Sequence, residues 1–179
     1  MSRVVRVASG QGFWGDWLEA PRRQVEGGPI DYLMLDYLAE VTMSILQKQK
    51  ERDPRMGYAR DFIGAMESIF PAAAERGVRV VANAGGVNPE ACAAALRETA
   101  RRAGVDDKLR IGVITGDDLL PRLDELIAGG HPLSNMESGE PLSMVRDRVL
   151  SANAYEEYEA GELRQVRGPQ DYFVTWSRL

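Results

Sequence analysis

The sequence predicts an α/β fold: a mainly parallel sheet with helices on both faces, in a Rossmann-like three-layer arrangement. Two observations lead to this prediction. Short apolar segments rich in valine alternate with longer segments in which apolar residues recur every three or four positions. Each short segment is also followed by a turn rich in glycine, asparagine or aspartate. Buried parallel strands have this uniformly apolar character because helices cover them.

The expected elements follow one another in a regular order. Strands are predicted at the short apolar segments 4–8, 30–35, 78–82 and 109–114. Helical spacing predicts helices at 21–25, 38–52, 62–74, 89–103 and 117–128, the third with a new helical turn beginning at Pro71. Beyond Gly130 the pattern weakens, and we expect a loop at 131–143, a helix at 144–155 and an edge strand at 171–176.

Length, charge and cysteine content limit the function classes. The net charge of −5 over 179 residues disfavours nucleic acid as a partner, since phosphate binding needs a basic surface. No apolar run approaches the ~20 residues that span a bilayer, so no membrane partner is expected. A single cysteine, Cys92, fits a reducing cytoplasm and lies in a small-residue helix typical of a structural thiol. With one histidine, His131, the chain cannot supply a His/Cys zinc cluster.

A glycine-rich turn follows the first predicted strand. Gly10, Gly12 and Gly15 have the Gly-x-Gly-x-x-Gly spacing of a dinucleotide site, and an acidic residue follows the second apolar run. That site needs a helix that begins within the glycines, so that its free N–H groups meet the pyrophosphate. Pro21 would interrupt such a helix, and large aromatic rings stand in the turn. We therefore regard NAD(P) as an unfavoured cofactor.

Polar residues and glycines follow every predicted strand at its carboxyl end, which is the edge where open parallel sheets bind ligands. We refer to this side of the sheet as the carboxyl edge and expect a small-molecule site there. Asp36, Glu40 and Asp117 are its candidates for acid–base catalysis. The expected ligand-binding residues are Ser9, Gly10, Gly12, Gly15, Asp16, Asp36, Asn83, Gly85, Gly86, Asn88, Thr115, Gly116, Asp117 and Asp118.

Several of these residues have structural alternatives. Asn88 fits the N-cap of the helix after it, as does one of the two aspartates after the fourth strand. Gly85-Gly86 fits a tight turn. Asp36 and Glu40 stand one turn apart at a helix start, where negative charge interacts favourably with the helix dipole. If the carboxylates instead converge, they suit a divalent cation such as Mg²⁺.

Five segments in their order resemble the N-terminal part of the acyclic terpene utilisation (AtuA-like) family. They are 9–16 (SGQGFWGD), 31–42 (DYLMLDYLAEVT), 79–89 (RVVANAGGVNP), 115–118 (TGDD) and 150–155 (LSANAY). The resemblance implies an α/β domain over 3–155 and a cytoplasmic catabolic protein that acts near CoA thioesters. It supplies no catalytic residue. Residues 156–179 depart from the family's continuation and form a divergent tail.

The residues and the resemblance together favour a protein that binds a small acid or an acyl-CoA intermediate at the carboxyl edge. One alternative is a non-catalytic subunit that binds a ligand or a partner there, and a less favoured one is an NAD-dependent oxidoreductase. We also expect self-association, since a second chain would cover the free edges of a sheet left by a shortened chain.

Overall fold

The computed structural model describes residues 4–131, 133–135 and 137–153. Within these ranges, three strands form one parallel sheet in the order β1-β2-β3: β1 (Val7–Gln11), β2 (Tyr32–Leu35) and β3 (Arg79–Ala82). Because each strand lies beside the previous one, both connections cross over in the same direction. The predicted α/β class with a parallel sheet is confirmed.

Helices connect the strands and follow the last one, and their ends match the local sequence. A proline stands in the first turn of two helices, at Pro21 and Pro89, where its missing N–H has no partner to lose. Gly77 ends another helix with a left-handed φ of 68°. The helices are α1 (Ala20–Gly27), α2 (Glu40–Arg52), α3 (Arg60–Arg76), α4 (Pro89–Arg102) and α5 (Leu123–Ala128), with 3₁₀ turns at Leu120–Arg122, Leu142–Met144 and Arg146–Arg148.

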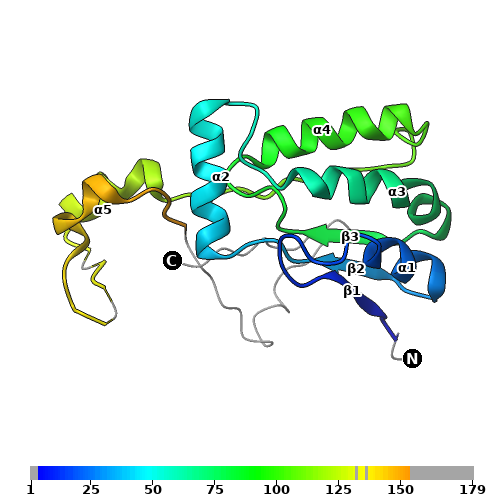
Figure 1. Ribbon diagram of the computed structural model, residues 1–179, viewed down its shortest axis with the longest axis horizontal. Coiled ribbons are helices and arrows are strands. Elements are labelled where there is room, and N and C mark those ends of the chain that lie inside the picture. The colour runs from blue at the N-terminus through cyan, green and yellow to red at the C-terminus, as the bar shows by residue number, and fades with distance from the viewer. Residues whose placement is uncertain (1–3, 132, 136, 154–179) are drawn as a thin grey trace.

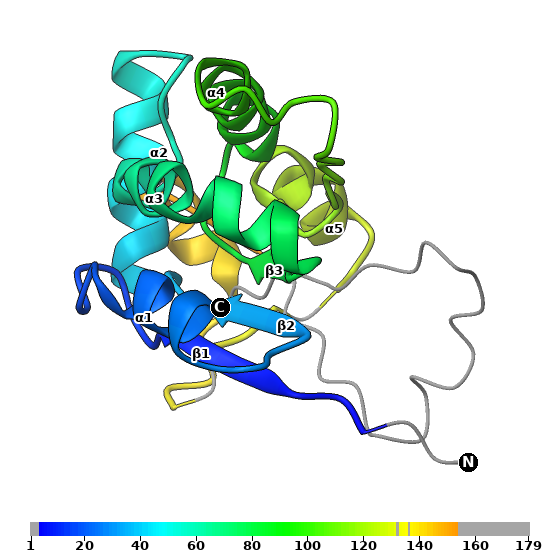
Figure 2. The same ribbon diagram turned by 90° about the vertical axis from the view of Figure 1, so that its right-hand side faces the viewer.

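Helices α1, α3 and α4 stack on one side of the sheet, whereas α2 stands across them beyond the strand ends and α5 lies apart (Figures 1 and 2). Helices α1 and α3 contact each other, α1 also contacts β1 and β2, and α4 packs on α3. The core lies between the sheet and α1 with α3, where Leu33, Val25 and Ile69 are 0% exposed. Burying a side chain of this size contributes about 1.5–3 kcal/mol. This packing holds the strand ends that form the carboxyl edge.

The opposite face of the sheet is not covered by the described helices. Side chains alternate along β2: Leu33 and Leu35 are buried, and Met34 between them is 40% exposed. On β1, Val7 is 67% exposed. The Arg79 guanidinium lies 5.5 Å from the Tyr32 ring centroid. Parallel sheets usually have both faces covered, so this face is open to a further layer.

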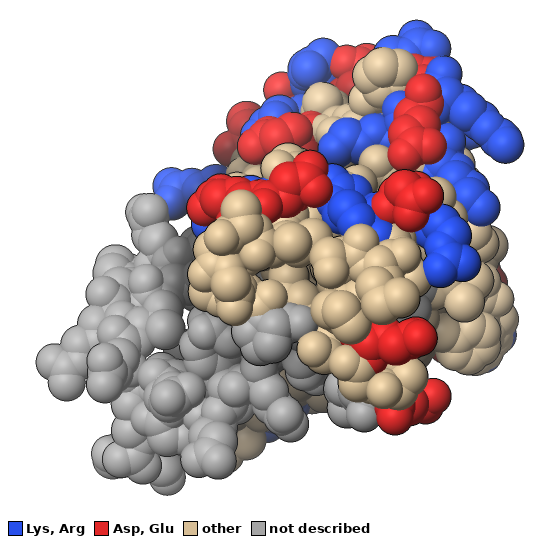
Figure 3. Space-filling view, turned by 90° about the vertical axis from the view of Figure 1, so that its left-hand side faces the viewer, with Lys and Arg blue, Asp and Glu red and all other residues tan. Residues whose placement is uncertain are grey.

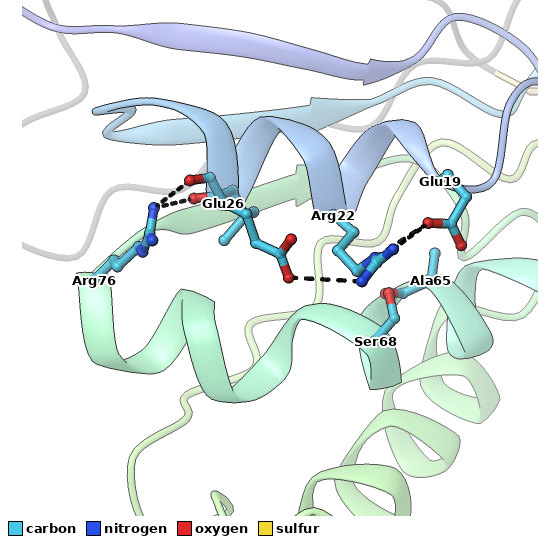
Figure 4. Close-up of polar contacts among 7 residues, drawn as sticks. Glu19, Arg22, Glu26, Ala65, Ser68 and Arg76 are labelled. Carbon is cyan, nitrogen blue, oxygen red and sulfur yellow. Dashed lines mark hydrogen bonds and ion pairs between the residues drawn. The ribbon is translucent and has the colours of Figure 1, made fainter.

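A basic side chain joins α3 to the end of α1, far from the carboxyl edge (Figure 4). Arg76 Nη1 donates to the carbonyl oxygen of Val25 at 2.6 Å and to that of Glu26 at 3.1 Å. These last carbonyls of α1 have no partner within their own helix. Along α1, Arg22 lies 2.8 Å from Glu19 and 4.0 Å from Glu26. The Arg76 hydrogen bonds therefore join the ends of α1 and α3 at the amino ends of the strands.

Several sequence-based expectations differ from the structure. The first strand is Val7–Gln11 instead of 4–8, and the helix expected at 117–128 is a 3₁₀ turn followed by α5. Within the described residues, helices cover one face of the sheet, where both faces were expected to be covered.

Three further segments also differ. Residues 109–114 form no strand. Leu109 and Ile111 pack partly against the core, but the segment pairs with no described strand, and Gly112 within it disfavours strand structure. The described part of 144–155 is not a helix, because its apolar side chains, such as Met144 at 66% exposure, have no core to pack on. Helix α3 continues through Pro71 instead of starting a new turn there, since buried residues before and after it hold one continuous face.

The expected edge strand at 171–176 and the tail at 156–179 lie outside the described residues. None of the helices within the described ranges is long and apolar enough to cross a membrane.

Candidate functional site

Asp36, Tyr37 and Asn83 join the ends of β2 and β3 at the carboxyl edge. Asn83 Nδ2 donates to Asp36 Oδ1 at 2.6 Å, and Asn83 Oδ1 accepts the Tyr37 N–H at 2.7 Å. Asp36 Oδ1 also accepts the Leu38 N–H at 3.3 Å, just before α2. Asn83 is 7% exposed. The structure therefore brings together two of the predicted site residues, Asp36 and Asn83.

Gln11 is buried at the end of β1, beside these residues. Its carbonyl oxygen accepts the Asp36 N–H at 3.0 Å. Its side chain is 1% exposed, and neither Nε2 nor Oε1 has a hydrogen-bond partner within the described residues. The Tyr37 hydroxyl shares both properties. Neither residue is among those expected from the sequence to bind a ligand.

The register of β1 explains the burial of Gln11, which the sequence does not predict. An irregularity between Ser9 and Gln11 adds a residue relative to β2, so that Gly10 and Gln11 are both buried. Strict alternation would instead place Gln11 on the same face as exposed Ser9. For Tyr37, the phase of Leu33 and Leu35 correctly predicts burial, but not an unpaired hydroxyl.

The loop between β1 and α1 is closed by an aspartate. Asp16 Oδ2 accepts the Gly12 N–H at 3.0 Å, and Oδ1 accepts the Trp17 N–H at 2.7 Å. These bonds, the Gly12 bond first, lower the pKa of Asp16. Trp14 Nε1 donates to Asp61 Oδ1 at 3.0 Å and its ring packs beside α2. Helix α1 begins only at Ala20, after the glycine turn.

The predicted glycines fall into two groups. A Cβ at Gly10 would meet Leu33 and Leu35, and one at Gly86 would collide with Leu46, so close packing accounts for these glycines. Gly85 behaves similarly, since a Cβ there would lie 2.8 Å from Pro89 Cβ. By contrast, Gly12, Gly15 and Gly116 face open space or a single carboxylate oxygen.

Three further predicted residues, Asn88, Asp118 and Ser9, lie away from the Asp36–Asn83 pair in the hydrogen-bond pattern. Asn88 precedes α4 without a side-chain cap; its Nδ2 donates to the carbonyl oxygens of Pro54 and Met56 at 2.8 and 2.6 Å. Asp118 Oδ1 accepts the N–H of Leu120, two residues along, at 3.0 Å, which is a local turn contact just before the 3₁₀ turn. Ser9 lies on the exposed face of the sheet, away from Leu33 and Leu35.

Asp117 lies beside residue 153, the last residue that the structure describes. Its Oδ2 accepts a hydrogen bond from Asn153 Nδ2 at 3.1 Å, and Asn153 is 2% exposed. Thr115 and Gly116 before it are exposed. That Asp117 shares one cleft with Asp36 and Asn83 stays a prediction.

The described residues contain no group of three or more His, Cys, Asp or Glu side chains placed to hold a metal ion. Glu40 opens α2. Burial raises the pKa of the Cys92 thiol to about 12, which keeps it protonated and unreactive at neutral pH. His131 is exposed on the turn after α5. The arrangement therefore supports hydrogen-bond recognition better than nucleophilic chemistry.

The described surface has two further features, a groove and a charged region. An open groove of about 460 Å³ lies at the amino ends of the strands, lined by residues that include Arg6, Asp31 and Arg76. The face that carries α5 shows Lys and Arg side chains among Asp and Glu in its upper part and a mainly uncharged surface below (Figure 3). The lining of the groove does not include Asp36 or Asn83.

Comparison with known families decides the classification. A model described as "Acyclic terpene utilisation family protein AtuA" matches residues 5–159. The chain belongs to the AtuA family. The resemblance drawn from the five segments is thus confirmed, and the match includes all three strands and the carboxyl edge of this AtuA-family chain. No curated protein and no solved structure matched.

Proposed function

We propose that this AtuA-family protein takes part in acyclic terpene utilisation by binding a small acid or acyl-CoA intermediate at the carboxyl edge. The family's name points to the pathway. The observation that supports the site is the group of polar side chains at three neighbouring strand ends: Gln11, Asp36 with Tyr37, and Asn83. Ligands of open parallel sheets bind at such ends. The single cysteine favours a cytoplasmic protein.

Thermal unfolding with candidate ligands tests the proposal. The wild type is measured with a branched acyl-CoA, its free acid, CoA, NAD⁺ and Mg²⁺. A ligand at 100 times its Kd stabilises the native state by about 2.7 kcal/mol. We expect the acyl-CoA or the acid to raise the unfolding midpoint, and Asp36→Asn to lose most of that rise.

Glu75→Gln is the matched control, because Glu75 is exposed near the end of α3, by the amino ends of the strands. It removes one carboxylate without touching the carboxyl edge and should keep the wild-type response. The proposal is wrong if neither the acyl-CoA nor the acid changes the wild-type midpoint, or if Asp36→Asn responds as the wild type does.

A non-catalytic binding subunit is the second candidate. The buried, protonated Cys92 and the exposed His131 favour it, because neither is placed as a nucleophile or base at the carboxyl edge. Incubating the protein with the ligand from the thermal assay and following thioester absorbance separates the candidates. Saturable binding without turnover supports the subunit, whereas turnover that Asp36→Asn abolishes supports an enzyme.

We further propose that the protein self-associates through the uncovered face of its sheet. Val7 and Met34 expose apolar surface on this face, which parallel sheets normally bury. Light scattering at increasing concentration should show a dimer or larger species for the wild type and less of it for Met34→Glu. Val41→Glu is the control, because Val41 is 71% exposed but lies on α2. A wild type that stays monomeric contradicts the proposal.

A further inference from the structure

Three buried side-chain atoms without a hydrogen-bond partner occur within the described residues, and they belong to only two residues. They are Gln11 Nε2, Gln11 Oε1 and the Tyr37 hydroxyl oxygen. Both side chains are 1% exposed. Buried polar groups in folded proteins nearly always have partners, because an unpaired one loses its hydration without compensation. Two such residues at the ends of neighbouring strands therefore require an explanation.

The two residues end neighbouring strands. Gln11 is the last residue of β1 and pairs in register with Leu35, the last residue of β2. Tyr37 lies two positions beyond Leu35 and continues the buried alternation of Leu33 and Leu35. The Asp36 N–H between them donates to the Gln11 carbonyl oxygen at 3.0 Å. Both side chains thus belong to the buried, helix-facing side of the carboxyl edge.

The surroundings keep the Tyr37 ring in place and its hydroxyl protonated. The ring packs edge-on against Phe62, with centroids 5.7 Å apart at 69°. Burial, together with the nearby Asp61 carboxylate, raises the pKa of the phenol, so it stays a neutral donor. With the Gln11 amide, this position offers donors from Nε2 and the hydroxyl and one acceptor from Oε1.

The charges of the neighbours limit what these groups can bind. Asp36 lies at the same strand end, and Asp61 acts electrostatically on Tyr37. A ligand carboxylate placed there would be repelled by two like charges in a poorly solvated position. An uncharged carbonyl group has no such penalty and accepts hydrogen bonds from the two donors.

We propose that Gln11 and Tyr37 recognise the uncharged carbonyl of an acyl thioester and discriminate against the free acid. This inference rests on the proposed function and narrows its ligand class. Gln11 Nε2 and the Tyr37 hydroxyl donate to the thioester oxygen, and Gln11 Oε1 accepts an amide N–H of the pantetheine arm. Gln11 leads directly into the β1–α1 loop, whose Gly12 and Gly15 are exposed. Gln11 and Tyr37 are therefore specificity residues.

Calorimetric binding of isovaleryl-CoA, isovalerate and CoA tests the inference on the full chain. The wild type should bind the thioester at least 10-fold more tightly than the acid or CoA. Tyr37→Phe, which removes one oxygen, should weaken thioester binding 10-fold or more. Gln11→Leu should abolish it while the unfolding midpoint stays equal or rises, because a buried unpaired amide is lost. Gln11→Met serves as a second variant if Gln11→Leu does not fold.

The outcomes separate this inference from the proposed function. If wild-type protein binds the thioester and both variants bind it equally well, buried water alone accounts for the unpaired atoms and the inference is wrong, while the proposed function stands. If the free acid binds as tightly as the thioester, the claimed discrimination is wrong. If the wild type binds neither, the proposed function fails and the inference fails with it.

Discussion

Asn83 and Asp36 link the ends of two neighbouring strands through a hydrogen bond of 2.6 Å between Asn83 Nδ2 and Asp36 Oδ1. The same Asn83 side chain accepts the Tyr37 N–H at 2.7 Å, so one amide satisfies a carboxylate and a backbone donor. A residue that donates and accepts at once is needed here, because the partners have opposite requirements. The carboxyl edge is therefore held together by an amide that no carboxylate can replace.

Replacing Asn83 tests this link. Asn83→Ala should lower the free energy of unfolding by about 1–3 kcal/mol, since it leaves the buried Tyr37 N–H without a partner. Asn83→Asp should cost more at pH 7, because a second carboxylate then faces Asp36. Repulsion from Asp36 would raise the pKa of the introduced carboxyl group in the folded state. The stability of the Asn83→Asp variant should therefore be higher at low pH and decrease as the pH rises.

Urea unfolding at pH 5 and pH 7 measures both effects. Gln49→Glu adds a charge on α2 away from Asp36 and is the control. Equal stability of Asn83→Asp at the two pH values would contradict the expected like-charge repulsion.

The glycines of the two turns should respond differently to substitution. At Gly86, with φ of 53°, a new Cβ would collide with Leu46 and lie 2.8 Å from the Gly57 carbonyl oxygen. Gly86→Ala should therefore cost about 2–4 kcal/mol, from strained backbone and overpacking. At Gly15, with φ of 90°, a Cβ meets nothing within 4 Å, so Gly15→Ala should cost only about 1–2 kcal/mol. Denaturant midpoints compare the stability of the two variants. A larger loss of stability for Gly15→Ala than for Gly86→Ala would contradict this prediction.

Sequence reasoning succeeded where one local rule decides the outcome. Short apolar segments predicted β2 and β3 closely, and Pro21 and Pro89 marked helix starts. It placed Asp36 and Asn83 at adjacent strand ends because parallel strands share a direction. The AtuA family also emerged from motif order.

It failed where tertiary packing decides. Residues 109–114 have strand composition, yet no neighbouring strand pairs with them. The first strand was predicted at 4–8, but it lies at Val7–Gln11, and an irregularity between Ser9 and Gln11 buries the Gln11 side chain. The role of Asn88 depends on Pro54 and Met56, far away in the sequence, so its capping appearance was misleading.

The Cys92 thiol should be inert in the folded protein. Burial raises its pKa to about 12, and it is the chain's one cysteine. Iodoacetamide at pH 8 should therefore modify it only after unfolding, at a rate that follows the denaturant curve. Since its pKa is higher in the folded state, stability should fall above pH 9, with a slope of up to about 1.4 kcal/mol per pH unit. Cys92→Ala should remove that part of the slope, and rapid labelling of native protein would contradict the assignment.

The glycine turn should not bind nicotinamide nucleotides, despite its spacing. The Gly12 N–H, which would meet a pyrophosphate, already donates to Asp16 at 3.0 Å, and α1 begins at Ala20. Asp36, which would hold ribose hydroxyls, accepts from Asn83 instead. Titration of NAD⁺ and NADP⁺ should therefore show no saturable change in tryptophan fluorescence below about 100 μM, or ~5.5 kcal/mol of binding free energy. Trp17→Phe identifies signals from the exposed ring of the loop. Saturable quenching of the wild type by either nucleotide in this range would contradict the prediction. Quenching seen only with Asp16→Asn would show that the Asp16 carboxylate is what keeps the turn from binding phosphate.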